Sequence, residues 1–248
     1  MRLVQGPVDA DGNPAMDLAV SHAVLRRVSR GELTTTLRVY CPRVPMVAFG
    51  RRDTHRPGFA AAVQACRDAG FTPAVRGTGG RAVAYTGSAL VLDQVTADLA
   101  ATEHLHARFR EYGELIAAVL RDIGVDARVG EVPGEYCPGA QSINARGQVK
   151  LVGTAQRLVR DAWMFSAVVI LNDADVIRPL LSEVYRSLDL PFEHASVGSV
   201  RAEAPDVDVD DLERALLTAY AGDDPLEPSA LDPGTLELAK QLLPDHQV

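Results

Sequence analysis

Strand-like segments of this sequence follow one another in adjacent pairs, as well as alternating with helices, and this order restricts the fold more than any other feature. Apolar residues recur with the period of an amphipathic helix over residues 13–27, 59–69, 99–122, 175–187, 209–221 and 235–243. β-Rich runs cover residues 35–40, 44–49, 71–75, 82–93, 141–144, 149–152 and 163–171. This mixture predicts an α+β fold with a mixed, largely antiparallel sheet flanked by helices, rather than a doubly wound parallel sheet.

The length and composition of the chain fit an intracellular globular protein. Its 248 residues, 47% of them hydrophobic, can bury a sizeable core. A formal charge of −8 argues against a general nucleic-acid binder, which normally carries a basic surface. The sequence has neither an apolar run of about 18 residues nor the apolar core of a secretory signal. Three cysteines without metal-type spacing fit reduced thiols. We therefore expect a soluble cytoplasmic protein without a metal site, bound to neither nucleic acid nor membrane, and monomeric by default.

A Gly-rich segment, Val75-Arg-Gly-Thr-Gly-Gly-Arg-Ala-Val83, follows the strand predicted over 71–75. Its three glycines lack Cβ atoms, so the backbone can approach a ligand closely or adopt positive φ. Its N–H groups can form an anion-binding concavity, to which Arg76 and Arg81 add donors for a carboxylate or phosphate. The segment formally fits the dinucleotide fingerprint, but strands rather than a helix follow it, which argues against that interpretation. A plain Gly-rich turn remains the alternative.

Lysine is rare in this chain. Of its 25 basic residues only Lys150 and Lys240 are lysines, and the rest are arginines. Lys150 begins the segment Lys150-Leu-Val-Gly-Thr-Ala-Gln-Arg157, where we expect it at the end of a short strand followed by a turn at Gly153. A lysine can be desolvated and have its pKa lowered, which an arginine cannot. The alternative is an ordinary solvated lysine, which is how we interpret Lys240 among the polar residues of the last helix.

Cys137 lies in the Gly- and Pro-containing segment Gly134-Glu-Tyr-Cys-Pro-Gly139. A cysteine on such a loop is a candidate reactive thiol, because a nearby cation would lower its pKa. Cys41 and Cys66 lie in apolar contexts that favour a structural role. The six histidines show no zinc-binding spacing, and we interpret them as structural or surface residues.

Together these segments resemble the catalytic domain of the lipoate–protein ligase A family, which includes the octanoyltransferases of lipoate assembly. The family's opening helix is similar to the one that begins Asn13-Pro-Ala-Met-Asp, and its strand ending in Gly-Arg is similar to Val47-Ala-Phe-Gly-Arg51. Its two signature motifs match Val75–Val83 and Lys150–Arg157 in the same order. The resemblance covers roughly residues 10 to 222.

This resemblance implies a fold akin to the catalytic domains of class II aminoacyl-tRNA synthetases and biotin ligases. It implies a catalytic domain over 1–222 and a tail over 223–248 with one helix and no full accessory domain. It also implies that the acyl group lies in a tunnel beside the Gly-rich segment. The residues that would bind the acyl group or an adenylate are Arg76, Gly77, Thr78, Gly79, Gly80, Arg81, Ala82, Val83, Gly153, Thr154 and Ala155.

Three activities follow from the resemblance. A transferase would carry octanoyl or lipoyl on a Cys137 thioester, with Lys150 polarising the carbonyl and stabilising the thiolate, and would need no cofactor. A ligase would use ATP and Mg to form a lipoyl-adenylate, with Lys150 contacting its acyl carbonyl and phosphate. A third possibility is a non-catalytic homologue that binds acyl groups or carriers. The implied partners are an octanoyl- or lipoyl-carrying protein, lipoyl domains of 2-oxoacid dehydrogenases and the glycine-cleavage H protein.

The spacing of Cys137, 13 residues before Lys150, is similar to that of the nucleophile in cysteine-dependent octanoyltransferases, which favours the transferase. Three positions depart from the family pattern. Val75 stands where the first arginine of the signature is expected, Tyr85-Thr86 replaces His-Asp, and Phe165-Ser166 replaces His-Gly. These changes remove polar groups that line the acyl and carrier site in relatives, and they are consistent with another acyl substrate.

Overall fold

The computed structural model describes residues 1–8 and 12–248 and contains two sheets. In spatial order the large sheet comprises β11 (Glu227–Pro228), β1 (Arg2–Gln5), β2 (Thr36–Tyr40), β6 (Ala89–Ala97), β10 (Ala162–Ile170), β9 (Val149–Val159), β8 (Ile143–Ala145) and β7 (Ala127–Val129). The small sheet comprises β4 (Thr72–Val75), β3 (Met46–Phe49) and β5 (Val83–Tyr85). Only the β11–β1, β1–β2 and β3–β4 pairs are parallel. The predicted mixed, largely antiparallel α+β fold is therefore confirmed.

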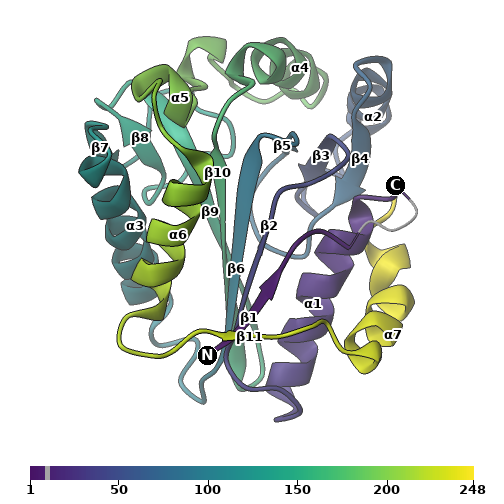
Figure 1. The fold of residues 1–248 in the computed structure, drawn as a ribbon. Helices are drawn as coiled ribbons and strands as arrows, with labels where there is room; N and C mark the ends of the chain where they lie inside the picture. The colour runs from purple at the N-terminus through teal and green to yellow at the C-terminus, as the bar shows by residue number, and fades with distance from the viewer. Residues whose placement is uncertain (9–11) are drawn as a thin grey trace.

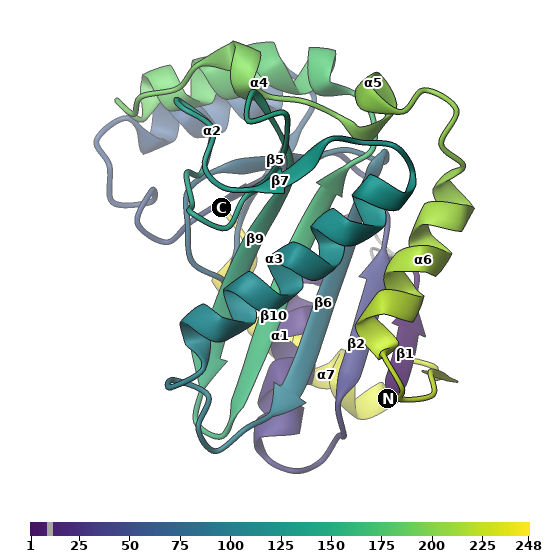
Figure 2. The same cartoon turned by 90° about the vertical axis from the view of Figure 1, so that its left-hand side faces the viewer.

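Helices cover both faces of the large sheet (Figure 1). The helices are α1 (Ala15–Ser29), α2 (Phe59–Asp68), α3 (Leu105–Asp122), α4 (Ala174–Ser187), α5 (Val200–Glu203), α6 (Val209–Ala221) and α7 (Pro233–Leu242), with 3-10 turns η1 (His194–Ser196) and η2 (Leu243–His246). α3 and α6 cover one face, as Figure 2 shows, and α1 and α7 lie on the other. None of the helices in the described ranges is long and apolar enough to cross a membrane.

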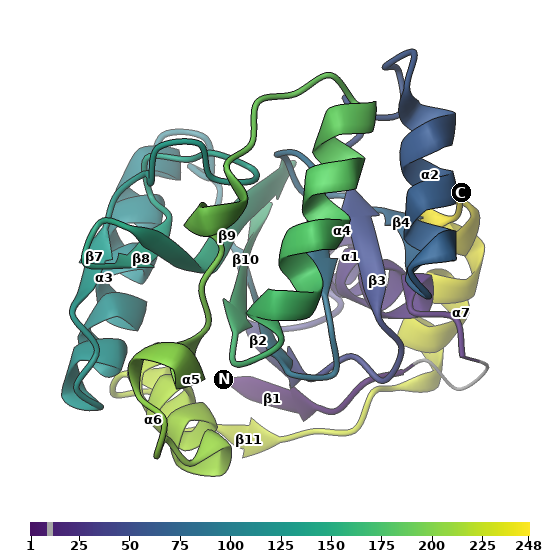
Figure 3. The same ribbon diagram turned by 90° about the horizontal axis from the view of Figure 1, so that it is seen from above.

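The alternation of side chains along the strands separates the cores on the two faces. On β2, Leu37 and Val39 join the core under α3 and α6, while Arg38 between them faces α1. Arg38 is fully buried, and it pairs with the equally buried Asp17 of α1. A separate core lies between the small sheet and the helices α2 and α4. Figure 3 shows these two helices from above.

Several boundaries differ from those that the sequence predicts. The helix expected from residue 99 begins at Leu105, and Leu99 is 90% exposed because a turn precedes the helix. The turn expected at Gly153 is wrong, because β10 supplies pairing partners along β9 as far as Val159. A hairpin turn joins β8 and β9, with positive φ at Arg146 and Gly147.

The segment 223–248 packs against the rest of the fold. β11 pairs with β1, and α7 packs along α1. The residues after α7 continue toward β4, where Gln247 forms an isolated antiparallel bridge with Ala74. This path brings the described C-terminal residues behind the Gly-rich segment, which begins where β4 ends.

Candidate active site

Cys137 lies on the loop between β7 and β8, and its backbone adopts a left-handed conformation. Its φ is 43°, which is uncommon for a residue other than glycine. The backbone N–H of Cys137 donates to the hydroxyl of Tyr185 over 2.6 Å, and that hydroxyl donates to the carbonyl of Ala82 over 2.9 Å. Because Tyr185 belongs to α4, this helix links the Cys137 loop to the end of the Gly-rich segment.

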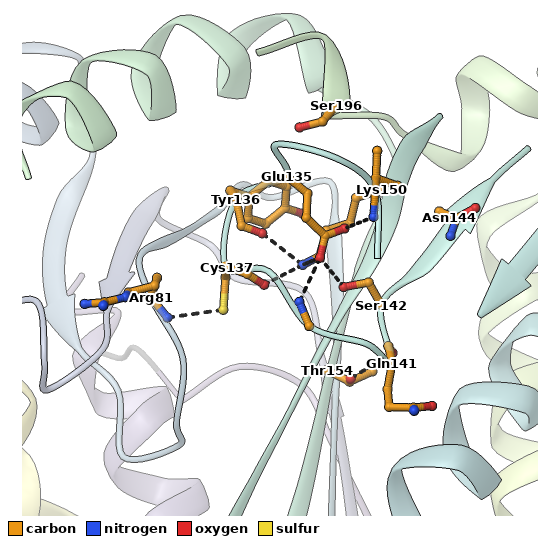
Figure 4. Close-up of polar contacts among 12 residues, drawn as sticks. Arg81, Glu135, Tyr136, Cys137, Gln141, Ser142, Asn144, Lys150, Thr154 and Ser196 are labelled. Carbon is orange, nitrogen blue, oxygen red and sulfur yellow. Dashed lines mark hydrogen bonds and ion pairs between the residues drawn. The ribbon is translucent and has the colours of Figure 1, made fainter. Parts of the chain in front are cut away.

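Two donors of the Gly-rich segment surround the Cys137 sulfur. Sγ accepts a hydrogen bond from Nη2 of Arg76 and another from the backbone N–H of Arg81, each over 3.2 Å. Figure 4 shows the contact with Arg81. Gly80 makes this approach possible: its φ is +104°, and a Cβ there would lie 2.5 Å from Sγ and 2.3 Å from Nη2 of Arg76. The structure thus brings together two of the predicted elements, the reactive cysteine and the Gly-rich segment.

These neighbours lower the pKa of the Cys137 thiol. Burial on its own raises that pKa, but the positive charges of Arg76 and Lys150 and the hydrogen bonds from Arg81 N–H and Arg76 outweigh it. At Cys66, by contrast, burial outweighs the opposing charge of Arg67 and raises the pKa to about 12. Cys137 is therefore the thiol of this chain that is best suited to act as a nucleophile.

Lys150, on β9, is 1% exposed and not a solvated surface lysine. Its Nζ donates to Oε1 of Glu135 over 3.2 Å and to the carbonyls of Tyr136 and Cys137 over 3.0 and 2.9 Å. Burial lowers the pKa of Lys150, and the negative charges of Glu135 and Cys137 oppose that effect. Since these three acceptors account for the three ammonium hydrogens, Lys150 holds the Cys137 loop directly and acts on the sulfur through its charge.

Glu135 is a buried residue of the site that the sequence analysis did not identify. Its Oε1 accepts from the N–H of Gly139 (3.0 Å), the hydroxyl of Ser142 (2.6 Å) and Lys150, and its Oε2 accepts from the N–H of Val132 (3.1 Å). Figure 4 shows these bonds converging on one carboxylate. The available signal was an acidic residue two positions before a loop cysteine, which is weak without the folded loop.

The side chain of Arg81 turns away from the sulfur that its backbone contacts (Figure 4). Its Nη1 pairs with Oδ1 of Asp53 over 3.0 Å, and Oδ2 of this fully buried carboxylate accepts from the N–H of Gly50. Gly50 in turn packs closely on Gly80, because a Cβ at Gly50 would lie 1.9 Å from the carbonyl oxygen of Gly80. Asp53, also absent from the sequence prediction, thus anchors the Gly-rich segment to the loop after β3.

A cavity of about 430 Å³ opens beside Cys137. The Gly-rich segment, the Cys137 loop and β9 form one side, and Leu105 and Phe109 of α3 form the other. Two nearly closed cavities lie close by, of about 20 Å³ against α1 and about 10 Å³ beside Cys137.

The residues predicted to bind the acyl group divide among these cavities. Gly79, Gly80, Thr154 and Ala155 line the large one. Gly77 and Thr78 line the cavity against α1, Val83 and Gly153 line the smallest one, and Arg76 lines both of these. Ala82 contributes its carbonyl to Tyr185, and Arg81 contributes its N–H to the sulfur.

Of the positions that depart from the family pattern, Tyr85 and Ser166 line the same small cavity and the others lie outside it. Val75 ends β4 in the core. Phe165 faces α3, where its ring stacks on Tyr112 at a centroid distance of 4.7 Å. The next residue, Ser166, points to the opposite face and lines the 20 Å³ cavity together with Tyr85. Thr86, beyond β5, is buried and caps the turn to Ser88.

The other cysteines are unpaired, as is Cys137, and burial raises the pKa of both Cys41 and Cys66. Within residues 1–8 and 12–248 no group of three or more histidine, cysteine or acidic side chains is arranged to hold a metal ion.

The fold and the site together define an acyl-handling catalytic domain of a known type. The family model of the lipoyl protein ligase A/B catalytic domain matches residues 13–221, and the chain belongs to this family. The matched range includes the Gly-rich segment, Cys137 and Lys150.

The individual relatives of this chain share about a quarter of its residues over the aligned regions. An octanoyl-[GcvH]:protein N-octanoyltransferase of Geobacillus kaustophilus is 26% identical over 160 residues, which is 64% of this chain and 56% of the relative. The chain spans about half the length of the curated relatives it matches. Among solved structures, a Thermoplasma acidophilum protein with bound lipoic acid superimposes with a TM-score of 0.76 at 24% identity, covering 98% of this chain and 95% of that one. A lipoate-protein ligase A bound with ATP gives 0.75 at 23% identity, covering 98% and 94%. At these identities the two structures establish the shared fold.

Proposed function

We propose that this protein transfers an octanoyl or lipoyl group to a lysine of a carrier domain through a thioester on Cys137. The observation that carries the proposal is the Cys137 sulfur itself, which lies between Arg76 and the N–H of Arg81 at the wall of a 430 Å³ cavity. A thiol with a lowered pKa beside a space large enough for an acyl chain has the two properties that covalent acyl transfer requires.

The proposed reaction has two balanced steps. The Cys137 thiolate attacks the acyl carbonyl, the bond between that carbonyl and the donor carrier breaks, and the leaving group of the carrier takes up a proton from the solvent, to which the second step returns one. The neutral ε-amine of the target lysine then attacks the thioester carbonyl, a C–N bond forms, the C–S bond breaks, and the amine gives up a proton. Arg76, the Arg81 N–H and the charge of Lys150 stabilise the thiolate before the first step and after the second.

The cavity sizes support a place for the acyl chain. Burying the six CH₂ groups of an octanoyl chain at about 0.8 kcal/mol each would contribute about 5 kcal/mol as an upper estimate. A cavity of about 150 Å³ holds a ligand the size of benzene, so an octanoyl chain needs more than the small cavities of about 20 and 10 Å³. The 430 Å³ cavity has that room, with Leu105 and Phe109 as apolar walls.

The partners of this reaction are a carrier that donates the acyl group and a carrier domain that accepts it. The name of the Geobacillus relative makes GcvH its donor. We propose the glycine-cleavage H protein, or another octanoyl- or lipoyl-carrying protein, as the donor here, and lipoyl domains of 2-oxoacid dehydrogenases as acceptors. The transfer needs no cofactor. We assign catalysis to residues 1–222, with 223–248 as a supporting segment, and place the protein in the cytoplasm, where its free thiols would stay reduced.

Transfer between purified carriers tests the proposal. The wild-type chain is incubated with a lipoyl domain and either octanoyl-H protein or an octanoyl carrier thioester, with and without ATP. We expect octanoylation of the lipoyl domain without ATP and its loss in Cys137→Ser, while Cys41→Ser serves as a matched control that retains transfer. Full transfer by Cys137→Ser would refute the role of Cys137. Acylation of the lipoyl domain from free lipoate and ATP, without transfer from either octanoyl carrier, would indicate a ligase instead.

A further inference from the structure

The described residues that follow α7 contact the Gly-rich segment from behind. η2 ends at His246, whose side chain is fully buried between α1 and β4. Nδ1 of His246 lies 2.8 Å from the carbonyl oxygen of Val75, and the next residue, Gln247, bridges to Ala74. A side chain distant in sequence therefore contacts the last peptide group of β4.

The hydrogen bonds define which nitrogen of each imidazole carries hydrogen. The Val75 carbonyl can only accept, so Nδ1 of His246 is the donor and its Nε2 has a free lone pair. That lone pair accepts from Nδ1 of His22, 3.1 Å away on α1. Burial lowers the pKa of both histidines, that of His22 to about 3, so the neutral pair that this pattern needs is the state near neutral pH.

The peptide group that His246 contacts is also held from its other side. Its N–H belongs to Arg76 and donates to the carbonyl of Phe49 over 2.9 Å. The carbonyl of this peptide accepts from His246 and its N–H donates to Phe49. The peptide plane between Val75 and Arg76 therefore cannot rotate without breaking one of these two hydrogen bonds. The orientation of this peptide sets the direction in which the Arg76 side chain leaves the backbone, toward Cys137.

We infer that His246, oriented by His22, is a positioning residue that aims the Arg76 guanidinium at the Cys137 sulfur. The catalytic importance of this role rests on the proposed function, but the effect on the thiol does not. It also connects residues after α7, through Val75 and Arg76, to the Cys137 sulfur, which lies more than a hundred positions earlier in the chain.

The test compares two replacements of His246. His246→Asn keeps a donor for Val75 at the position of Nδ1, whereas His246→Phe fills the space without a donor or an acceptor. The rate of alkylation at Cys137 by iodoacetamide is followed across pH by peptide-resolved mass spectrometry, and Lys240→Gln on α7 is the control. Circular dichroism at the assay temperature confirms that each variant is folded.

We expect His246→Phe to shift the alkylation profile to higher pH and to slow labelling near pH 7 by about threefold to tenfold, as for the loss of a typical hydrogen bond. His246→Asn is expected to stay close to wild type. Equal profiles for His246→Phe and wild type, or equal shifts in both His246 variants, would overturn the inference. If the shift occurs but wild type never forms an acyl adduct, the proposed function fails and the positioning role stands.

Discussion

Replacing Glu135 by glutamine perturbs the Cys137 loop with the smallest change in shape. The carboxylate accepts four hydrogen bonds, three on Oε1 and one on Oε2. A glutamine amide must place its NH₂ group against either the Val132 N–H or the three donors at Oε1. In both orientations donors oppose donors, and the buried ammonium of Lys150 loses its counter-charge.

The magnitude follows from the burial of the pair. Both side chains are at most 1% exposed, and removing one partner of such a pair typically costs about 3–5 kcal/mol. In this variant Lys150 retains its hydrogen bonds to the carbonyls of Tyr136 and Cys137. We therefore expect Glu135→Gln to lower the free energy of unfolding by about 3 kcal/mol, the lower end of that range. At about 2–4 °C per kcal/mol for a chain of this size, Tm would fall by roughly 6–12 °C.

A double-mutant cycle in denaturant measures this coupling. Lys150→Met alone leaves an unpaired carboxylate and should also destabilise by about 3 kcal/mol, whereas Glu135→Leu with Lys150→Met removes both charges together. We expect the double variant to be more stable than the sum of the single effects predicts by at least about 2 kcal/mol, with Glu135→Leu completing the cycle. Additivity within about 0.5 kcal/mol would refute the assignment of Glu135 and Lys150 as the pair that holds the loop.

Three further predictions concern the thiol, the Gly-rich segment and pH. Arg76→Met should shift alkylation of the active thiol to higher pH, whereas Arg81→Met should not, because only the backbone of Arg81 contacts the sulfur; the same shift in both would contradict this geometry. Gly80→Ala should lower acyl transfer at least about tenfold and also lower the free energy of unfolding, while Gly79→Ala, whose Cβ would meet no protein atom within 4 Å, should leave the free energy of unfolding near wild type; equal stabilities would contradict the close approach at Gly80. Between about pH 6.5 and 3 the unfolded chain binds a proton at His22 that the native state does not. The free energy of unfolding should therefore decrease as the pH is lowered through this range. Between about pH 7.5 and 5, denaturant titrations should show that His22→Gln loses up to about 2 kcal/mol less than wild type, and equal losses would argue against the buried neutral imidazole.

Periodicity predicted most of the fold because it reports which face of an element is buried. The helices α1, α2, α4 and α6 and the strands β2, β4 and β10 lie within a few residues of their predicted positions. The short strands β1, β7 and β11 were not predicted, since runs of two to four residues carry too little pattern. The continuation of β9 past Gly153 depends on β10 and so could not be read locally.

The site was predictable only where one segment carried its own chemistry. Residue type and the resemblance to the family together singled out Cys137, Lys150 and the Gly-rich segment, and the structure places Arg76 and Cys137 in contact across 61 residues. Glu135, Tyr185 and Asp53 were not identified, because each acts through contacts that exist only in the folded chain. The burial of Lys150, which the sequence left undecided, follows from the loop that folds over it.

Trapping the acyl-enzyme tests the thioester most directly. The wild-type chain is mixed with octanoyl-H protein or an octanoyl carrier thioester without acceptor, quenched in acid and digested for peptide mass spectrometry. We predict one octanoyl group on Cys137 that hydroxylamine removes and that disappears when a lipoyl domain is added before the quench. An acceptor that becomes octanoylated while Cys137 stays unmodified at every time point would contradict covalent transfer through this cysteine.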